Sequence, residues 1–267
     1  MSASKVFTPV LAVCAALLVI FFAVPVATMV FAETPTSLLR ALADREVVSA
    51  LWVSTAGSSV STAIALLFGV PAGYLLARRD FPAKALVGAL FDMPVVIPHL
   101  VAGIALLTVL APQGLLGAPL GRLHLRFVDA LPGTVAAMLF VSGPFVVNAA
   151  RSAFEAVDPK LEAASRILGA SAARAFFSVS LPLARGGIIA GAVMAWARAV
   201  SEFGAVLVLA YYPRTAPTLV YERFTSTGLA GGRPAAVLLV IICLALFVAL
   251  RLGVRRPVPL IGGGGRA

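Results

Sequence analysis

Arg198 and Glu202 are two charged residues inside an apolar run, and their spacing suggests that they interact. They stand four positions apart, with Ser201 between them, in a stretch from 186 to 211 that is otherwise uncharged. On a helix, side chains at i and i+4 lie on one face and can form an ion pair. Two interpretations follow: the pair fixes the packing of a helix, or Arg198 supplies positive potential along a path for an anion.

A second polar group lies in an earlier apolar run. It contains Asp92 and His99 together with two prolines, Pro94 and Pro98. Prolines inside a helical pattern bend the helix, and polar side chains at such a bend suggest a water-filled path. No second ligand stands near His99, so the sequence predicts no metal site.

The sequence contains no recognisable set of catalytic residues. A phosphate-binding loop needs a Gly-rich turn that ends in Lys-Ser or Lys-Thr, and none of the lysines, Lys5, Lys84 and Lys160, follows a glycine. The two cysteines, Cys14 and Cys243, lie in separate apolar runs and predict no disulfide framework. We therefore expect no catalytic residues, no cofactor and no ATP hydrolysis by this chain itself.

The composition points to a lipid environment. Of the 267 residues, 61% are apolar and 12% are charged, whereas soluble domains carry about 25% charged residues. The net charge is +10. The basic residues stand at the ends of apolar runs and do not cluster with aromatic residues, which disfavours nucleic-acid binding. The sequence therefore predicts an all-α, multi-pass protein of the cell (plasma or inner) membrane.

Six apolar runs have a length close to the roughly 20 residues that cross a bilayer as a helix. They cover residues 6–32, 47–77, 85–111, 132–150, 186–211 and 234–250. We thus expect about six transmembrane helices. In this division, a first helix and an outer segment occupy 1–47, a transmembrane core occupies 48–251, and a glycine-rich, disordered cytoplasmic tail occupies 252–267.

The lysine and arginine residues predict the orientation. With six spans, both termini, the connection 78–84 and the longer connection 151–185 share one side, and that side carries most of the basic residues. Cytoplasmic loops are enriched in Lys and Arg. We therefore expect both termini and the longer connection to lie in the cytoplasm.

This longer connection begins with the pattern of a short helix. Asp158 followed by Pro159 is a helix start, because Asp caps and Pro fits the first helical position. Glu162 and Arg166 are spaced for an ion pair along this helix. Gly169 is expected to end it in a left-handed conformation.

A second short helix is expected to follow, with Ser171 as its cap and Pro182 as its end. Residues 153–182 then form a helix–glycine–helix hairpin with a face of small residues, which lets another backbone approach closely. Two interpretations remain: an ordinary loop between two spans, or a docking site for a soluble cytoplasmic partner.

The hairpin sequence resembles a family signature. The run Glu162-Ala-Ala-Ser-Arg-Ile-Leu-Gly169, followed after nine residues by Val179-Ser-Leu-Pro182, resembles the signature loop of binding-protein-dependent, type-I ABC importer permeases. The spacing from the glycine to Leu-Pro matches that family. Glu162 stands one residue further from Gly169 than is common, and Ala163 occupies the usual glutamate position. The stretch Gly69-Val-Pro-Ala-Gly-Tyr-Leu-Leu-Ala-Arg78 resembles the end of the second core helix in these permeases.

This resemblance implies the type-I ABC importer permease fold and a role in transport. In that family the loop docks into a cleft on a separate ATPase subunit. The implied partners are two copies of an ABC ATPase subunit, an extracellular substrate-binding protein, a second copy of this chain and the lipid bilayer. The residues that carry the ATPase-coupling role under this resemblance are Glu162, Ala163, Ala164, Gly169, Leu181 and Pro182.

Further stretches resemble the molybdate/tungstate permeases, with the sulfate permeases as nearest neighbours. These stretches are Asp92-Met-Pro-Val-Val-Ile-Pro-His99, Ser201-Glu-Phe-Gly204 and Tyr211-Tyr-Pro-Arg-Thr-Ala-Pro217. The candidates for a translocation path, or for an intramembrane polar pair, are Arg198, Ser201, Glu202, Asp92 and His99. Two alternatives remain: a permease for sulfate or another oxyanion, and a secondary transporter driven by an ion gradient, which would predict inverted repeats.

Overall fold

The computed structural model describes residues 3–254, and the regular structure in that range is entirely helical. The elements in chain order are α1 (Ala3–Phe31), α2 (Pro35–Ala43), α3 (Arg45–Arg78), α4 (Lys84–Val96), α5 (His99–Leu110), α6 (Gly117–Arg122), α7 (Leu131–Glu155), α8 (Pro159–Ile167), α9 (Ala172–Ala175), the π-helical turn η1 (Phe176–Ser180), α10 (Leu181–Val200), α11 (Gly204–Leu209), α12 (Ala216–Thr227) and α13 (Leu229–Val254). The predicted tail 252–267 lies, from residue 255 on, outside the described residues.

Five helices are long and apolar enough to cross a bilayer. They are α1, α3, α7, α13 and the continuous stretch Ala172–Val200, which comprises α9, η1 and α10. The pair α4 and α5 makes a sixth span if it is counted as one, although the two helices meet at an angle of 115°. The predicted all-α architecture with about six membrane helices is confirmed, and the prolines of the third run mark a sharp break.

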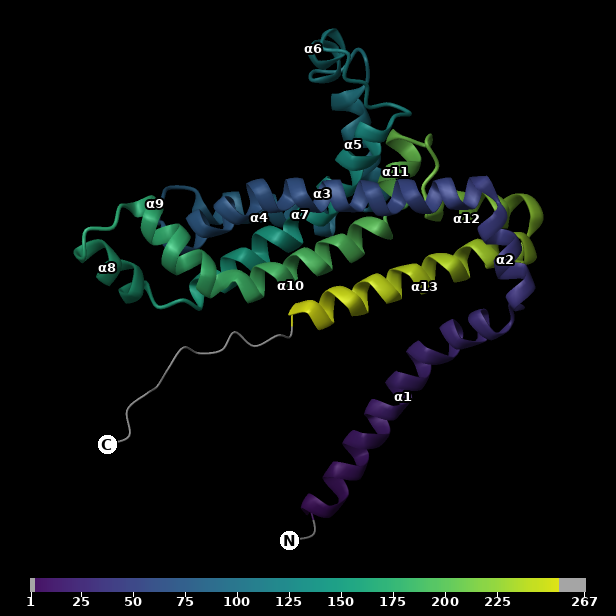
Figure 1. The fold of residues 1–267 in the computed structure, drawn as a ribbon, viewed down its shortest axis with the longest axis horizontal. Helices are drawn as coiled ribbons and strands as arrows, with labels where there is room; N and C mark the ends of the chain where they lie inside the picture. The colour runs from purple at the N-terminus through teal and green to yellow at the C-terminus, as the bar shows by residue number, and fades with distance from the viewer. Residues whose placement is uncertain (1–2, 255–267) are drawn as a thin grey trace.

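Helices α3, α7 and α10 form the centre of the bundle, and α13 runs alongside them (Figure 1). Small residues bring these helices close together. A Cβ atom added to Gly73 of α3 would lie 2.8 Å from the Cβ atom of Ala150 on α7. A Cβ atom added to Gly191 of α10 would lie 2.2 Å from the Cβ atom of Ala149. Larger side chains at these glycines would therefore push the central helices apart.

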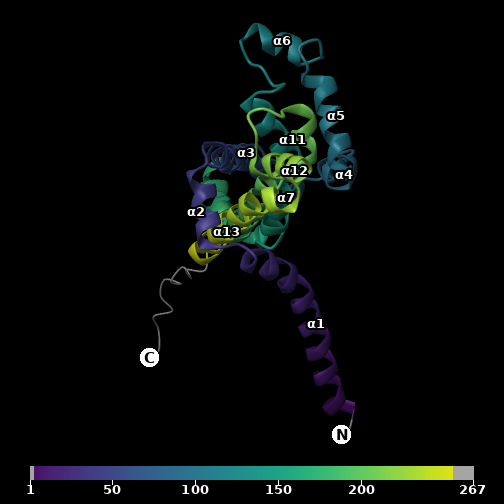
Figure 2. The same cartoon turned by 90° about the vertical axis from the view of Figure 1, so that its right-hand side faces the viewer.

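Helix α1 stands apart from this bundle. It leaves on the side opposite to α5 and α6 in both side views (Figures 1 and 2). The most apolar segment of α1 is not buried by any other part of the described chain. Its attachment lies near its C-terminal end, where Glu33 pairs with Arg233 of α13.

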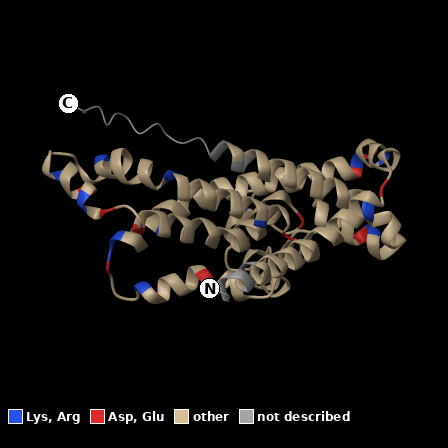
Figure 3. Ribbon diagram, turned by 90° about the horizontal axis from the view of Figure 1, so that it is seen from below, with Lys and Arg blue, Asp and Glu red and all other residues tan. Residues whose placement is uncertain are grey.

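Charged residues lie mainly towards the two ends of the long helices, and few lie in the middle of the bundle (Figure 3). This distribution is the one expected of a protein whose mid-section lies in hydrocarbon. The few charges that do lie within the spans are therefore the ones that need partners.

The fifth predicted span, residues 186–211, is wrong in both bounds. The helix begins at Ala172 and ends at Val200, so Ser201 and Glu202 lie in a break before α11 and not on the span itself. Glu202 explains this break, because its Oε1 atom accepts the backbone N–H of Ala205 at 2.8 Å. A side chain that bonds to nearby backbone competes with the continuation of a helix.

Pro182 was expected to stop a short helix, and this prediction is also wrong. The ring of a proline clashes with the carbonyl four residues earlier in a regular α-helix. Here that residue, Ser178, lies within the π-helical turn η1, where the N–H of Leu181 bonds to the carbonyl of Phe176. The wider turn accommodates the ring, and the helix continues into α10.

Candidate functional site

The helix–glycine–helix hairpin predicted from the sequence is present as α8 and α9, projecting beyond one end of the bundle (Figure 1). The Asp158 side chain caps α8 by accepting the N–H of Lys160 at 2.9 Å. Gly169 has φ +90°, the left-handed conformation predicted for it. Ser171 Oγ accepts the N–H of Arg174 at 3.2 Å and caps α9. The two predicted caps and the left-handed glycine are thus confirmed.

The tip of this hairpin exposes apolar side chains. Ile167 and Leu168 have 86% and 88% of their surface exposed, directly before Gly169. Ala163, Ala164 and Gly169 are exposed as well. Exposed apolar groups on a segment outside the bundle are typical of a surface that a partner protein covers.

Glu162 does not pair with Arg166, so that prediction is wrong. Its carboxylate turns towards the bundle, where it accepts the hydroxyl of Tyr74 at 2.5 Å and the hydroxyl of Ser180 at 2.9 Å. The guanidinium of Arg78 lies 3.7 Å away. Two hydrogen-bond donors and a nearby guanidinium from the bundle outweigh one solvent-exposed partner, because an ion pair in water contributes little.

Arg198, Glu202, Ser201 and His99 meet at a polar junction between two broken helices. Arg198 Nη2 lies 2.6 Å from Glu202 Oε2, and 2.8 Å from Nε2 and 3.1 Å from Nδ1 of His99. The Glu202 side chain is fully buried. Ser201 Oγ lies 3.4 Å from Arg198 Nη1. The predicted pairing of Arg198 with Glu202 is therefore confirmed, and His99 joins it.

Asp92 does not belong to this junction. Its carboxylate accepts a hydrogen bond of 2.6 Å from the amide of Asn148, which joins α4 to α7. Sequence reasoning overlooked Asn148, although it is the only asparagine in the sequence and lies inside an apolar run. A lone amide in such a run is a usable signal, because buried polar side chains need partners.

A network of ion pairs at the opposite end of the bundle was also not predicted. Arg223 of α12 contacts Asp44 at 2.6 Å and Glu46 at 3.3 Å, at the start of α3. Arg214 contacts Glu222 at 2.7 Å. The hydrogen bond from Arg223 lowers the pKa of Asp44 below its usual value. The pairs of Arg223 with Asp44 and Glu46 join segments far apart in the sequence, so only the fold reveals them.

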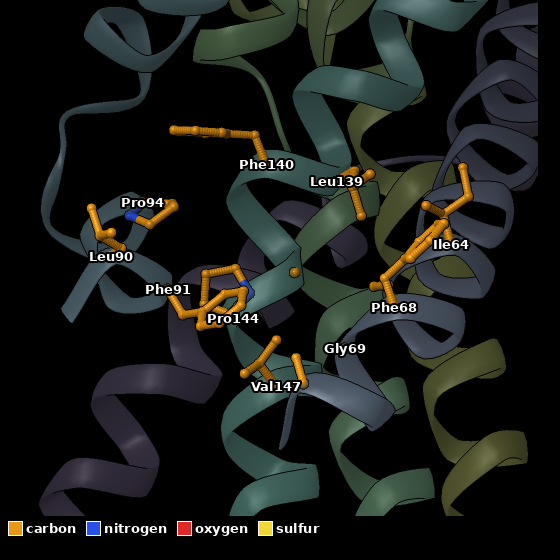
Figure 4. Close-up of a pocket in the computed structure, with 13 residues that line it drawn as sticks. Ile64, Phe68, Gly69, Leu90, Phe91, Pro94, Leu139, Phe140, Pro144 and Val147 are labelled. Atoms are coloured by element: carbon orange, nitrogen blue, oxygen red, sulfur yellow. The ribbon is translucent and has the colours of Figure 1, made fainter. Parts of the chain in front are cut away.

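An apolar groove with a cavity volume of about 290 Å³ lies between α3, α4 and α7 (Figure 4). Phe68, Phe91 and Phe140 line it together with Pro94 and Pro144. Every lining side chain is apolar. This groove therefore offers no side-chain donor to an anion and is not a candidate oxyanion site.

Comparison with protein families gives a match over residues 69–257 to the family described as binding-protein-dependent transport system inner membrane component. The chain is 48% identical over 236 residues to a molybdate/tungstate transport system permease protein of Thermococcus kodakarensis, covering 88% of this chain and 90% of the relative. It is 49% identical over 215 residues to the molybdate/tungstate permease protein of Pyrococcus furiosus, covering 80% and 81%.

Among solved structures, the chain is similar to a chain of a bacterial alginate ABC transporter in complex with an alginate-bound periplasmic protein. The TM-score is 0.71 and the alignment covers 95% of each chain, at 16% sequence identity. At this level of identity the likeness establishes the fold, which is that of an ABC importer permease.

Proposed function

Because the chain belongs to the family of binding-protein-dependent transport system inner membrane components, we propose that it is the permease subunit of an ATP-driven importer of molybdate and tungstate. The observation that carries the proposal is the identity of nearly half of its residues, over most of both chains, with permeases named for that transport. It provides a path across the membrane and performs no covalent chemistry.

Energy enters from a separate ATPase subunit. The proposed contact is the α8–α9 hairpin, whose exposed Ile167 and Leu168 stand beside the left-handed Gly169. Closing of an ATPase dimer against this hairpin would move the spans attached to it. The permease then alternates between two states, and each ligand shifts the balance between them.

The proposed assembly contains two copies of this chain, two ATPase subunits and one extracellular substrate-binding protein. The hairpin and both termini face the cytoplasm, in line with the excess of Lys and Arg on that side. The division into a first helix, a core over 48–251 and a cytoplasmic tail remains a prediction. The tail beyond residue 254 lies outside the part of the chain described here.

The polar junction is the proposed point where the path passes between the broken helices. Side chains of Arg198 and His99 are 21% and 44% exposed, so both present polar atoms to a space that water can enter. A cationic group beside such a space favours a passing oxyanion. Glu202 neutralises most of the charge of Arg198, which favours passage over tight binding.

Transport in vesicles tests the proposed function. The permease, its cognate ATPase and its binding protein would be reconstituted together, and uptake of molybdate, tungstate, sulfate and phosphate compared with and without ATP. We expect ATP-dependent uptake of molybdate and tungstate, with no ATP turnover by the permease alone. Preferential uptake of sulfate would identify the chain as a sulfate permease instead. ATP-independent uptake would favour a secondary transporter.

A matched pair of leucines tests the hairpin as the ATPase contact. Leu168 at its tip is 88% exposed, and Leu115, in the connection before α6 and away from the hairpin, is 82% exposed. We expect Leu168→Glu to abolish co-purification with the ATPase and Leu115→Glu to leave it intact. Equal retention of the ATPase by both variants would place the contact elsewhere.

A further inference from the structure

The carboxylate of Glu162 is the place where α8 is tied to the bundle. Its side chain is only 16% exposed, although α8 projects from the molecule. Oε1 accepts the hydroxyl of Tyr74 on α3, and Oε2 accepts the hydroxyl of Ser180 in η1. Hydrogen bonds to an ionised acceptor are about twice as strong as neutral ones. Each oxygen thus links α8 to a different membrane helix.

Arg78 adds a second tie from the same end of α3. Its Nε atom lies 3.7 Å from Glu162 Oε2, and its Nη2 atom donates to the carbonyl of Val157 at 2.7 Å. Val157 immediately precedes the cap of α8. Both the start and the middle of α8 are therefore attached to the last turns of α3.

Tyr74 is itself held firmly in place. Its ring packs edge-on against Phe154 of α7, with ring centres 5.1 Å apart, and against Phe176 of η1, at 4.8 Å. The phenol hydroxyl is thus presented to α8 from a rigid aromatic cluster. A carboxylate bound to that hydroxyl follows the cluster when it moves.

The outward side of α8 has a different composition. Ala163 and Ala164, the next two residues, are exposed, and Leu161 is half exposed. A partner that lies on this face touches small and apolar groups, whereas the carboxylate of Glu162 is turned away from it and already bonded.

We infer that Glu162 is a positioning residue: it transmits displacement of α8 to α3 and to the π-helical start of α10, and it is not a contact of the ATPase. This inference rests on the proposed function. Without the carboxylate, the ATPase still docks on the outward face, but α8 moves without carrying the two membrane helices with it. ATP is then hydrolysed without transport.

The test uses the complete reconstituted importer with Glu162→Ala and Tyr74→Phe. The second variant keeps the aromatic packing and removes only the hydroxyl, so it remains informative where Glu162→Ala fails to fold. Asp80→Ala is the matched control, because Asp80 is a fully exposed acid on the same side, paired only with Lys84 in the described structure. ATPase retention and the number of ATP molecules hydrolysed per oxyanion imported are measured together.

We expect wild-type ATPase retention in all three variants. The ATP-to-oxyanion ratio should rise by about tenfold in Glu162→Ala, within the usual range of coupling between sites, and by a smaller factor in Tyr74→Phe. The double variant should resemble Glu162→Ala alone, because the hydroxyl and the carboxylate act through one bond. Asp80→Ala should keep the wild-type ratio.

Two outcomes would overturn the inference. Loss of the ATPase from Glu162→Ala, with an unchanged ratio in Tyr74→Phe, would make Glu162 a docking contact. An unchanged ratio in both variants would leave it without a coupling role. Neither result would contradict the proposed function. Only failure of the wild-type importer to assemble and to transport would contradict it.

Discussion

Arg198 and Glu202 are joined by an ion pair of 2.6 Å in which the carboxylate is fully buried and the guanidinium is about one-fifth exposed. The carboxylate also receives the N–H of Ala205, and the guanidinium also reaches His99. The pair therefore holds together the break between α10 and α11 and the start of α5. Its loss affects the fold and the proposed path at the same point.

Removing one partner of this pair should cost more than removing both. Glu202→Gln leaves the guanidinium of Arg198 without its counter-charge, and breaking a buried pair costs about 3–5 kcal/mol. Arg198→Met combined with Glu202→Gln leaves no unpaired charge, so its thermal stability in detergent should lie above that of either single variant. If the losses of the single variants simply add, the two residues are not coupled.

Gly169 provides a second prediction, with a control at the other end of the molecule. Gly169→Asp should weaken ATPase docking and abolish uptake while leaving membrane insertion intact, because it puts a charge and a strained turn beside the hairpin tip. Gly228, between α12 and α13, also has positive φ, at +74°, and open space around an added Cβ atom. Gly228→Asp should bear a similar strain and still retain the ATPase. Wild-type docking and uptake in Gly169→Asp would rule out the hairpin as the coupling element.

Two glycines of α10 test the close packing of the bundle. In Gly191→Ala the new Cβ atom would lie 2.2 Å from the Cβ atom of Ala149, and overpacking of this kind costs about 1–3 kcal/mol. Gly186 has no atom within 4 Å of an added Cβ atom. Gly186→Ala should stabilise the helix by roughly 0.5–1 kcal/mol. The two melting temperatures, measured on the purified chain in detergent, should therefore shift in opposite directions.

Asp44 gives the end of the bundle opposite the hairpin a dependence on pH. The hydrogen bond from Arg223 lowers its pKa below the ordinary value of 3.8. A lowered pKa in the folded state adds stability above pH 3.8, and that stability is lost as the pH falls through the folded-state value. Asp44→Asn keeps an oxygen that can cap α3 and removes the charge. Its melting temperature should fall less than that of the wild type between pH 5 and about pH 3.

The membrane spans and the hairpin caps could be predicted because their causes are local. The length of an apolar run sets whether a helix can cross a bilayer, and Asp158, Gly169 and Ser171 act on the backbone within a few residues of themselves. The same local reasoning placed Arg198 beside Glu202, since only the turn of a helix separates them.

The errors arise where distant segments compete for a side chain. The i+4 rule assigned Glu162 to Arg166, but Tyr74 and Ser180 approach it only after α3 and η1 have packed. Asp92 likewise finds Asn148 across a helix contact. The span that was drawn through Ser201 failed for a local reason, because the neighbouring Glu202 accepts the backbone N–H of Ala205.

The isolation of α1 has a consequence for how the chain enters the membrane during synthesis. The most apolar segment of α1 has a mean hydropathy of 2.9, and none of it is buried by the rest of the chain. The corresponding segment of α7 has a mean hydropathy of 1.5 and is 56% buried. The nascent α1 can therefore leave the translocon for lipid on its own apolarity. Helix α7 is less apolar and packs most extensively against α3 and α10, so its stable integration depends on α3, already made, and on α10, which emerges later from the ribosome. Mutations in α10 should consequently impair the integration of a helix that precedes it in the sequence.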